Sequence, residues 1–275
     1  MYTKMKTFLI FFFAFIFTAV IAVYQRMTGP TYPVRGKVEI NNQQIKYQLL
    51  TSASGTEDAP LFLQVPDQSV TGEIRFKRFK SNDSITTKPL IRAGNFLVTL
   101  IPHQPAAGKI QYKITLISNN VEYELSKKDV VLRYKGSVPA SWLIPHIFFI
   151  FLAMLFSTIT GLEAILKGKN TLLYTWITII TLLLGGLILG PIVQKFSFGV
   201  YWTGWPFGHD MTDNKSLVAF IFWIIALIVQ YRNRENRAWP VIAAFVMLVV
   251  FLIPHSVLGS EIDYSKDQKT ETHGN

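Results

Sequence analysis

The class of fold is decided by residues Trp142–Leu166, which read WLIPHIFFIFLAMLFSTITGLEAIL. Glu163 is the only residue of this stretch that carries a full charge when histidine is neutral. A helix needs about 20 consecutive apolar residues to cross the hydrocarbon core of a bilayer, and this stretch is longer than that. The sequence therefore predicts a transmembrane helix here.

Four further apolar stretches have a spanning or near-spanning length. They are Phe8–Tyr24, Thr171–Val193, Asp213–Tyr231 and Trp239–Leu258. Half of all residues are hydrophobic and 14% are aromatic, and they form longer uninterrupted runs than an ordinary soluble domain carries. We therefore expect an integral membrane protein with five transmembrane helices, an N-terminal anchor followed by a four-helix bundle.

The N-terminal sequence MYTKMKTFLIFFFAFIFTAVIAVYQRM joins a basic start to a long apolar run. No clear small-residue cleavage site follows this run, so we expect an uncleaved anchor, with a cleaved signal peptide as the alternative. The short loops are rich in basic residues, which mark the cytoplasmic side of a membrane. These residues are Lys4, Lys6, Lys167, Lys169, Arg232, Arg234 and Arg237. We expect a multi-pass protein of the bacterial cytoplasmic (inner) membrane, with its N-terminus inside and its C-terminus in the periplasm.

The segment between the first two apolar stretches has a different pattern. Short runs such as VRGKVEI, NFLVTLI and KIQYKITLI alternate apolar and polar residues, which is typical of strands. Asn41-Asn42 suits a tight hairpin, and Gln104–Gly108 suits a loop between strands. Seven or eight strands without a helical window favour an inserted extracytoplasmic β-sandwich. The expected domains are anchor 1–27, β-sandwich 28–138, four-helix membrane domain 139–260 and extracytoplasmic tail 261–275.

Charge and cysteine content narrow the function. The chain has no cysteine, which excludes disulfides and thiolate metal ligands, and its formal net charge is +10. The segment Arg75–Lys80 (RFKRFK) places charges on both faces of a strand, which predicts an edge strand. Nucleic acid is not an expected partner, because the basic domain is expected outside the membrane and nucleic acid is inside the cell.

Two resemblances add to this interpretation. At PAAGKIQYKITLI the chain resembles the late strands of immunoglobulin-like and fibronectin type III sandwiches, with Tyr112 at the position of their corner tyrosine. That resemblance implies an adhesive or docking module, and hence an envelope protein partner that binds through the β-sandwich. The segments IPHxxxxFLAMLFST and WTGWPFGHDMTDNK resemble a bacterial membrane-protein family without assigned activity, which implies no particular function.

Three of the five histidines follow the same tripeptide, Leu-Ile-Pro. They are His103, His146 and His255. His103 ends a predicted strand, where we regard the match as a coincidence. His146 lies one helical turn from Trp142 at the outer interface, and the last apolar stretch, counted outward from Trp239, brings His255 to the same depth.

The start of the fourth helix brings further polar residues to this layer. Because its apolar core is short, the helix must begin near Asp213, so YWTGWPFGHDMTDNKS lies at the outer interface. His209 and Asp213 are four residues apart and share a face if this turn is helical. Asp210 lies between them, and Glu261 follows the last helix. A layer of imidazole and carboxylate groups at one depth is therefore predicted.

Such a layer is a candidate metal site. Imidazole nitrogens and carboxylate oxygens are ligands of divalent transition metals such as zinc, copper and iron. The predicted ligands are His146, His209, His255, Asp213, Asp210 and Glu261. Three alternatives remain open: a purely structural polar layer that caps helices, haem bound by His146 and His255, and the handling of protons or small solutes.

The sequence favours a binding or accessory membrane protein of the cell envelope, whose partners are the lipid bilayer and an envelope protein. The competing hypothesis is an enzyme, either a membrane metalloenzyme or a redox subunit with bound haem, that acts at the outer face. In that case Asp210 or Glu261 would serve as the base or as the partner of a metal ligand.

Overall fold

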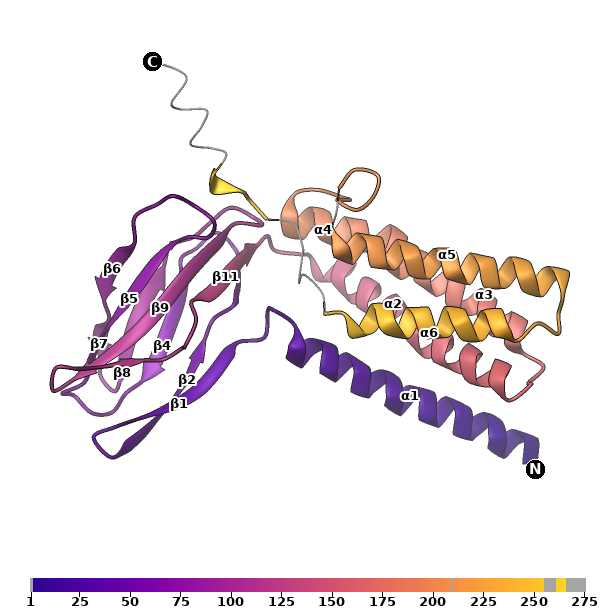
Figure 1. Ribbon diagram of the computed structural model, residues 1–275, viewed down its shortest axis with the longest axis horizontal. Coiled ribbons are helices and arrows are strands. Elements are labelled where there is room, and N and C mark those ends of the chain that lie inside the picture. The colour runs from indigo at the N-terminus through magenta and orange to yellow at the C-terminus, as the bar shows by residue number, and fades with distance from the viewer. Residues whose placement is uncertain (1, 209, 255–260, 266–275) are drawn as a thin grey trace, which may run out of the picture. The chain divides into compact units, whose positions relative to one another are not determined.

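The structure, a computed structural model, describes residues 2–208, 210–254 and 261–265, and the side chains of these from Met5 onward. The chain forms two compact units (Figure 1). The helical unit comprises Met1–Pro30 and Val138–Ser260, and the β unit comprises Thr31–Ser137 and Glu261–Asn275. His209, His255 and most of the predicted tail lie outside the described residues.

The helical unit consists of apolar helices joined by short turns (Figure 1). Four described helical segments are long and apolar enough to cross a membrane by length and composition. The fifth, α6, has 15 residues, so the predicted count of five spans stays a prediction. The helices are α1 (Tyr2–Thr28), α2 (Ala140–Ile165), α3 (Thr171–Leu182), α4 (Gly190–Phe198), α5 (Met211–Arg232) and α6 (Ala238–Leu252).

A π-helical turn, η1 (Leu183–Leu189), joins α3 to α4 without a break in the helix. The sequence explains its position, because Pro191 has no N–H with which to continue the regular ladder. Instead Gly190 N–H donates to Gly185 O, five residues earlier. Gly185 also lets α2 approach closely, since a Cβ there would lie 2.8 Å from Ile150 N.

Hydrogen bonds between polar side chains connect neighbouring helices in the bundle interior. The hydroxyls of Thr160 and Thr178 are 3.3 Å apart, and Gln230 Nε2 donates to Thr175 Oγ1 at 3.0 Å. Trp223 is fully buried, with its Nε1 3.1 Å from Met247 Sδ. Interhelical contacts of this kind stabilise helix association where lipid offers no hydrophobic driving force.

The β unit contains three described sheets (Figure 1). Strands β1 and β2 form a hairpin, the order of the largest sheet is β3-β11-β9-β5-β6 with β10 beside β9, and the third is β4-β8-β7. The strands are β1 (Val34–Ile40), β2 (Gln43–Leu49), β3 (Ser52–Ser54), β4 (Ala59–Gln64), β5 (Thr71–Arg78), β6 (Thr86–Pro89), β7 (Ile91–Ala93), β8 (Phe96–Ile101), β9 (Lys109–Ser118), β10 (Val121–Glu124) and β11 (Val130–Lys135).

Several strand predictions can be compared directly. Asn41 and Asn42 form the predicted hairpin turn, with φ values of 50° and 59°. The prediction of an edge strand at Arg75–Lys80 is wrong for Arg75 and Phe76, which pair with β9 on one side and β6 on the other, whereas the described pairing of Lys77 and Arg78 is with β9. The hydroxyl of Tyr112 donates to Leu50 O at 2.8 Å, whereas a tyrosine corner uses backbone a few residues upstream. The immunoglobulin-like assignment therefore stays a prediction.

The segment after α6 packs on the β unit. Glu261 is paired with both Lys80 and Lys109, and Tyr264 is 5% exposed under the Arg78 guanidinium, 4.7 Å from the ring centroid. Burial opposes ionisation of Glu261, but the hydrogen bonds from the two lysines outweigh it and hold the pKa of the carboxyl below its usual range. The predicted extracytoplasmic tail thus begins as part of the β unit.

Candidate functional site

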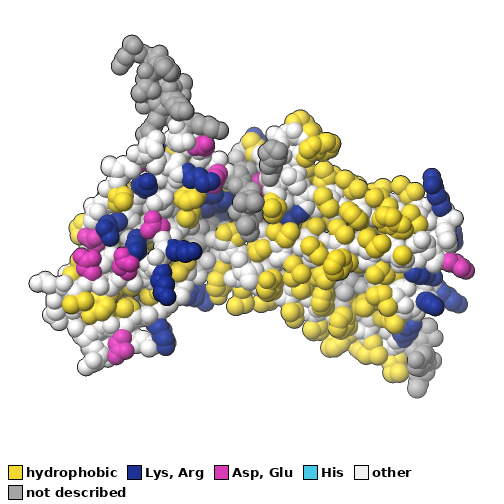
Figure 2. Space-filling model, viewed as in Figure 1, with side chains coloured by type: hydrophobic (Ala, Val, Ile, Leu, Met, Phe, Trp, Pro, Cys, Tyr) yellow, Lys and Arg dark blue, Asp and Glu magenta, His cyan; other side chains and the backbone are white. Residues whose placement is uncertain are grey.

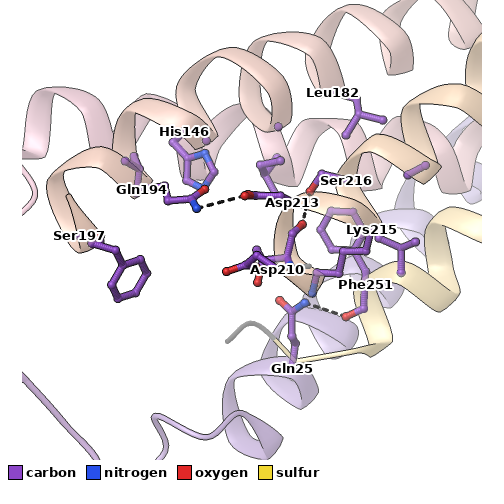
Figure 3. Close-up of a pocket in the computed structure, with 18 residues that line it drawn as sticks. Gln25, His146, Leu182, Gln194, Ser197, Asp210, Asp213, Lys215, Ser216 and Phe251 are labelled. Atoms are coloured by element: carbon purple, nitrogen blue, oxygen red, sulfur yellow. Dashed lines mark hydrogen bonds between the residues drawn. The ribbon is translucent and has the colours of Figure 1, made fainter. Parts of the chain in front are cut away.

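The helical unit encloses a cavity of about 190 Å³. Figure 3 shows side chains from α1, α2, α5 and α6, and from the α3–η1–α4 helix, around this space. Its apolar lining includes Ile150, Leu182 and Phe251. Its polar lining consists mainly of Gln25, His146, Gln194, Asp210, Asp213 and Lys215. Such a density of ionisable groups in an apolar bundle marks a functional candidate.

Asp213, in the first turn of α5, organises one wall of the cavity. Its Oδ2 accepts from Thr203 N at 2.7 Å, from Gln194 Nε2 at 3.1 Å and from Thr203 Oγ1 at 3.3 Å. Its other oxygen, Oδ1, has no hydrogen-bond partner within the described ranges. The carboxylate therefore fixes the preceding loop with one oxygen and keeps the other available.

The loop between α4 and α5 is held in place from both of its ends. Asp210 caps α5 by accepting from Thr212 N at 2.8 Å, and its own N–H donates to Thr203 O at 2.9 Å. Asn214 Oδ1 accepts from Trp205 N at 2.6 Å. The loop presents its aromatic side chains outward, with Phe207 84% exposed. Exposed aromatics of this kind are typical of membrane interfaces.

His146 projects from α2 toward the π-helical turn. Its Nδ1 lies 2.9 Å from Gly185 O, and because a carbonyl can only accept, Nδ1 carries the proton in this bond. In a neutral ring Nε2 is then unprotonated, and it has no partner among the residues that the structure describes. The π-helical turn thus selects the tautomer that leaves Nε2 free to bind a donor or a metal ion.

Lys215 and Gln25 meet at the C-terminal end of α6. Lys215 is 6% exposed and its Nζ donates to Ile253 O at 2.7 Å, while Gln25 Nε2 donates to Phe251 O at 2.8 Å. These bonds satisfy carbonyl groups that the end of a helix leaves open, and a cation is favoured at this end of the helix dipole. The N-terminal helix, through Gln25, therefore forms part of the cavity wall.

The structure brings only some of the predicted residues together. His146, Asp210 and Asp213 line one cavity, as the depth argument suggested, whereas Glu261 belongs to the β unit. His209 and His255 lie outside the described residues, and among those described no group of three or more His, Cys, Asp or Glu residues is placed to hold a metal ion. The six-residue metal site therefore stays a prediction.

Sequence reasoning missed Gln25, Gln194 and Lys215. Lys215 offered a signal, because a lysine near the end of a spanning stretch is costly unless it has a role. Gln25 and Gln194 offered a weaker one, each being a carboxamide that follows an apolar run. Their assembly depends on how the helices pack, which the spacing of residues along one helix does not reveal.

No known protein-family model, curated protein or solved structure matches this chain.

Proposed function

We propose that this chain is an integral membrane binding protein of the cell envelope, whose helical unit binds a small cation or polar solute in the cavity. The observation that supports this proposal most directly is the pair of unpartnered atoms in its lining, His146 Nε2 and Asp213 Oδ1. One is a lone-pair donor and the other an anionic oxygen. Together they suit a divalent transition-metal ion such as zinc, copper or iron.

The size of the cavity favours a ligand of few atoms. Pockets for drug-sized molecules occupy roughly 300–1,000 Å³, and this cavity, at about 190 Å³, is smaller. A porphyrin does not suit this volume, so haem is the weaker of the two cofactor hypotheses. Lys215 lines the same cavity, and its positive charge opposes the binding of a cation. A neutral or anionic polar solute is therefore the alternative ligand to a metal ion.

The enzyme alternative uses the same residues. A metal ion held by His146 and Asp213 would leave coordination positions open, as catalytic sites require, and Asp210 would be the nearby carboxylate for proton transfer. The exposed aromatic loop beside Asp213 would then face a substrate at the outer leaflet. The binding proposal is favoured because it requires only His146 and Asp213 as ligands, whereas the enzyme also requires a residue for proton transfer.

Metal content tests the proposal. Full-length protein purified in detergent should carry close to one zinc, copper or iron ion per chain by plasma mass spectrometry, or bind one on titration. His146→Ala and Asp213→Asn should each lower that content at least tenfold. His103→Ala, a histidine variant in the β unit, is the matched control and should retain it. Metal-free wild-type protein that also fails to bind added metal would remove the metal from the proposal.

A second proposed function, docking of an envelope partner, is supported by the β4-β8-β7 sheet. Its outward side chains are almost all apolar, which is uncommon for a sheet face outside a membrane. Phe62 is 59% exposed and Ile91 70%. Next to it is a groove lined by Phe62, Phe96 and the cations Arg35, Lys37 and Lys46. The outward residues are Pro60, Phe62, Ile91, Ala93, Phe96, Val98, Leu100 and the polar Gln64.

This surface suits a protein that presents apolar side chains flanked by acidic ones. Crosslinking in native membranes, with identification of the adduct, should recover one protein with the wild-type chain and lose it with Phe62→Asp. Val121→Asp is the control, because Val121 is similarly exposed on β10 of another sheet. Equal recovery with both variants would exclude this surface as the docking site.

A further inference from the structure

A second hollow in the helical unit lies between α1 and α2, at the end where α1 begins. It has a volume of about 430 Å³ and is lined by Met5, Leu9, Ile10, Phe13, Leu162 and Leu166, with Lys6 as the charged residue among the described lining. A hollow with an apolar wall and a single ammonium group has the character of an amphiphile site. It shares no lining residue with the cavity described above.

The groove exists because α1 packs on the bundle along a narrow seam. Ile10 and Ala14 are buried in this seam, and the Phe11 ring makes an edge contact with Phe156 at 6.3 Å. The flanking residues Leu9 and Phe13 are more than half exposed. Protein does not fill the space beside the seam, so in a bilayer the space is available to an acyl chain.

Positive charge collects at the same end of the unit. Lys6 Nζ donates to Leu166 O at 3.1 Å, which ties α1 to the end of α2 and leaves two of its three N–H groups. Lys167 and Lys169 follow α2 directly and are exposed. Figure 2 shows Lys and Arg side chains, together with an acidic side chain, at one end of the helical unit.

Within the described ranges, no acidic side chain forms an ion pair with these lysines. Glu163, one turn before Lys167, is turned inward, where its Oε1 accepts from Asn170 N at 3.1 Å. The described ion pairs all belong to the β unit, and Lys6, Lys167 and Lys169 take part in none of them. Three unpaired ammonium groups at one end of an apolar groove require an anionic group in solution or in the membrane.

We propose that the groove binds one anionic phospholipid, with an acyl chain along Leu9, Phe13 and Leu162 and the phosphate at Lys6 and Lys167. Basic pockets between transmembrane helices bind anionic headgroups in this way. The phosphate oxygens accept charge-assisted hydrogen bonds from the free N–H groups of the ammonium. The lipid thereby completes the contact between the N-terminal helix and the bundle. This proposal is independent of the ligand in the cavity.

Native mass spectrometry of the full chain in detergent tests it, with dioleoylphosphatidylglycerol and dioleoylphosphatidylcholine as probes. Each lysine near a headgroup contributes about fivefold in affinity, so two should give phosphatidylglycerol an advantage of about 25-fold. Lys6→Gln combined with Lys167→Gln should abolish that advantage. Lys195→Gln, an exposed lysine on α4, is the matched control and should preserve it.

Two further arms separate the sources of binding. Leu9→Trp should fill the groove and weaken the binding of both lipids. Excess inorganic phosphate should not displace phosphatidylglycerol if the acyl chain contributes to binding. Lys167→Gln alone, at an exposed position, should lower the advantage about fivefold even if the double variant does not fold. Equal binding of the two lipids by the wild type, or displacement by phosphate, would overturn the proposal.

Discussion

The two units differ in the partners that bind their charged side chains. In the β unit acids meet bases: Arg78 donates to Asp83 at 2.7 and 2.9 Å, and Lys113 lies 2.6 Å from Glu124. In the helical unit the buried Asp213 is instead bound by N–H and hydroxyl donors, and the buried Lys215 by a carbonyl. Paired charges are neutralised, whereas charges held by the backbone remain available to a ligand.

The largest expected effect comes from breaking the backbone arrangement that holds His146. In Gly185→Val the new side chain would meet the α2 backbone at Ile150, and overpacking of this kind typically costs about 1–3 kcal/mol and occasionally more. The bond between His146 and Gly185 O should be lost together with tight helix packing. Thermal unfolding in detergent measures the loss of stability, and ligand or metal binding should fall with it.

Gly186→Ala is the control for that change. A Cβ at Gly186 would lie 3.3 Å from the flexible tip of Leu182, which can move. The Ala variant should therefore unfold within a few degrees of the wild type. If Gly185→Val proved equally stable, the close packing of η1 on α2 would not be what positions His146.

Asp213→Ala should have the next largest effect. It leaves Thr203 N–H without its acceptor in a partly buried site, which costs about 1–3 kcal/mol. The loop before α5 should become accessible to chymotrypsin at its exposed aromatic residues. Asp213→Asn keeps an acceptor oxygen and should retain the loop while losing the negative charge. Equal cleavage of both variants and the wild type would show that Asp213 does not hold the loop.

Lowering the pH should weaken the paired charges of the β unit. Hydrogen bonds from Arg78 lower the pKa of Asp83 from 3.8 to about 2. Because the folded value lies below the unfolded one, the pair stabilises fully above pH 3.8 and its contribution is lost as the pH falls through 2. Both groups are partly exposed, so solvent screening limits this contribution to about 1 kcal/mol.

Hydrogen exchange of the β5 amides measures this loss between about pH 5 and pH 2. Asp83→Asn should already exchange faster at the higher pH and should show a shallower pH dependence than the wild type. Parallel pH dependences in the two proteins would mean that the pair does not report on folding of this strand.

The smallest effect should have the opposite sign. Lys37 and Lys46 face each other across the β1-β2 hairpin, and like charges directly opposite are destabilising. Lys37→Thr should therefore stabilise the hairpin by about 0.2–1 kcal/mol. Unfolding by denaturant measures the gain, with Lys88→Thr as a control outside the hairpin. A loss of stability would indicate that the lysine stems pack on the groove.

Elements that depend on residues close together in the sequence were predicted well, whereas those that depend on contacts between distant segments were not. The β1-β2 hairpin was predicted closely because its turn depends on two adjacent asparagines. Pro191 explains where the regular ladder is interrupted, but the contacts of the π-helical turn could not be predicted, since Gly185 meets both His146 and the α2 backbone. The position of Arg75 and Phe76 inside the sheet was missed for a related reason, because their second neighbour, β6, is a separate segment of the chain.

The candidate site shows the same limit. Counting residues from Trp142, and back from the inner end of the fourth predicted helix at Tyr231, brought His146 and Asp213 to one depth, and they line one cavity. Depth is a one-dimensional property that a sequence carries. A sequence does not reveal which helices are neighbours. Gln25 on α1 and Lys215 on α5 were therefore not predicted as residues of the cavity wall.

The docking of Glu261 and Tyr264 on the β unit has a consequence for biogenesis. The β unit is made early, between the first two helices, yet two of its contacting residues follow α6. The ribosome must therefore synthesise every helix of the bundle before the Lys80, Lys109 and Arg78 contacts can form. Protection of Tyr264 from solvent would report, in a translation time course, that every helix of the bundle has been synthesised.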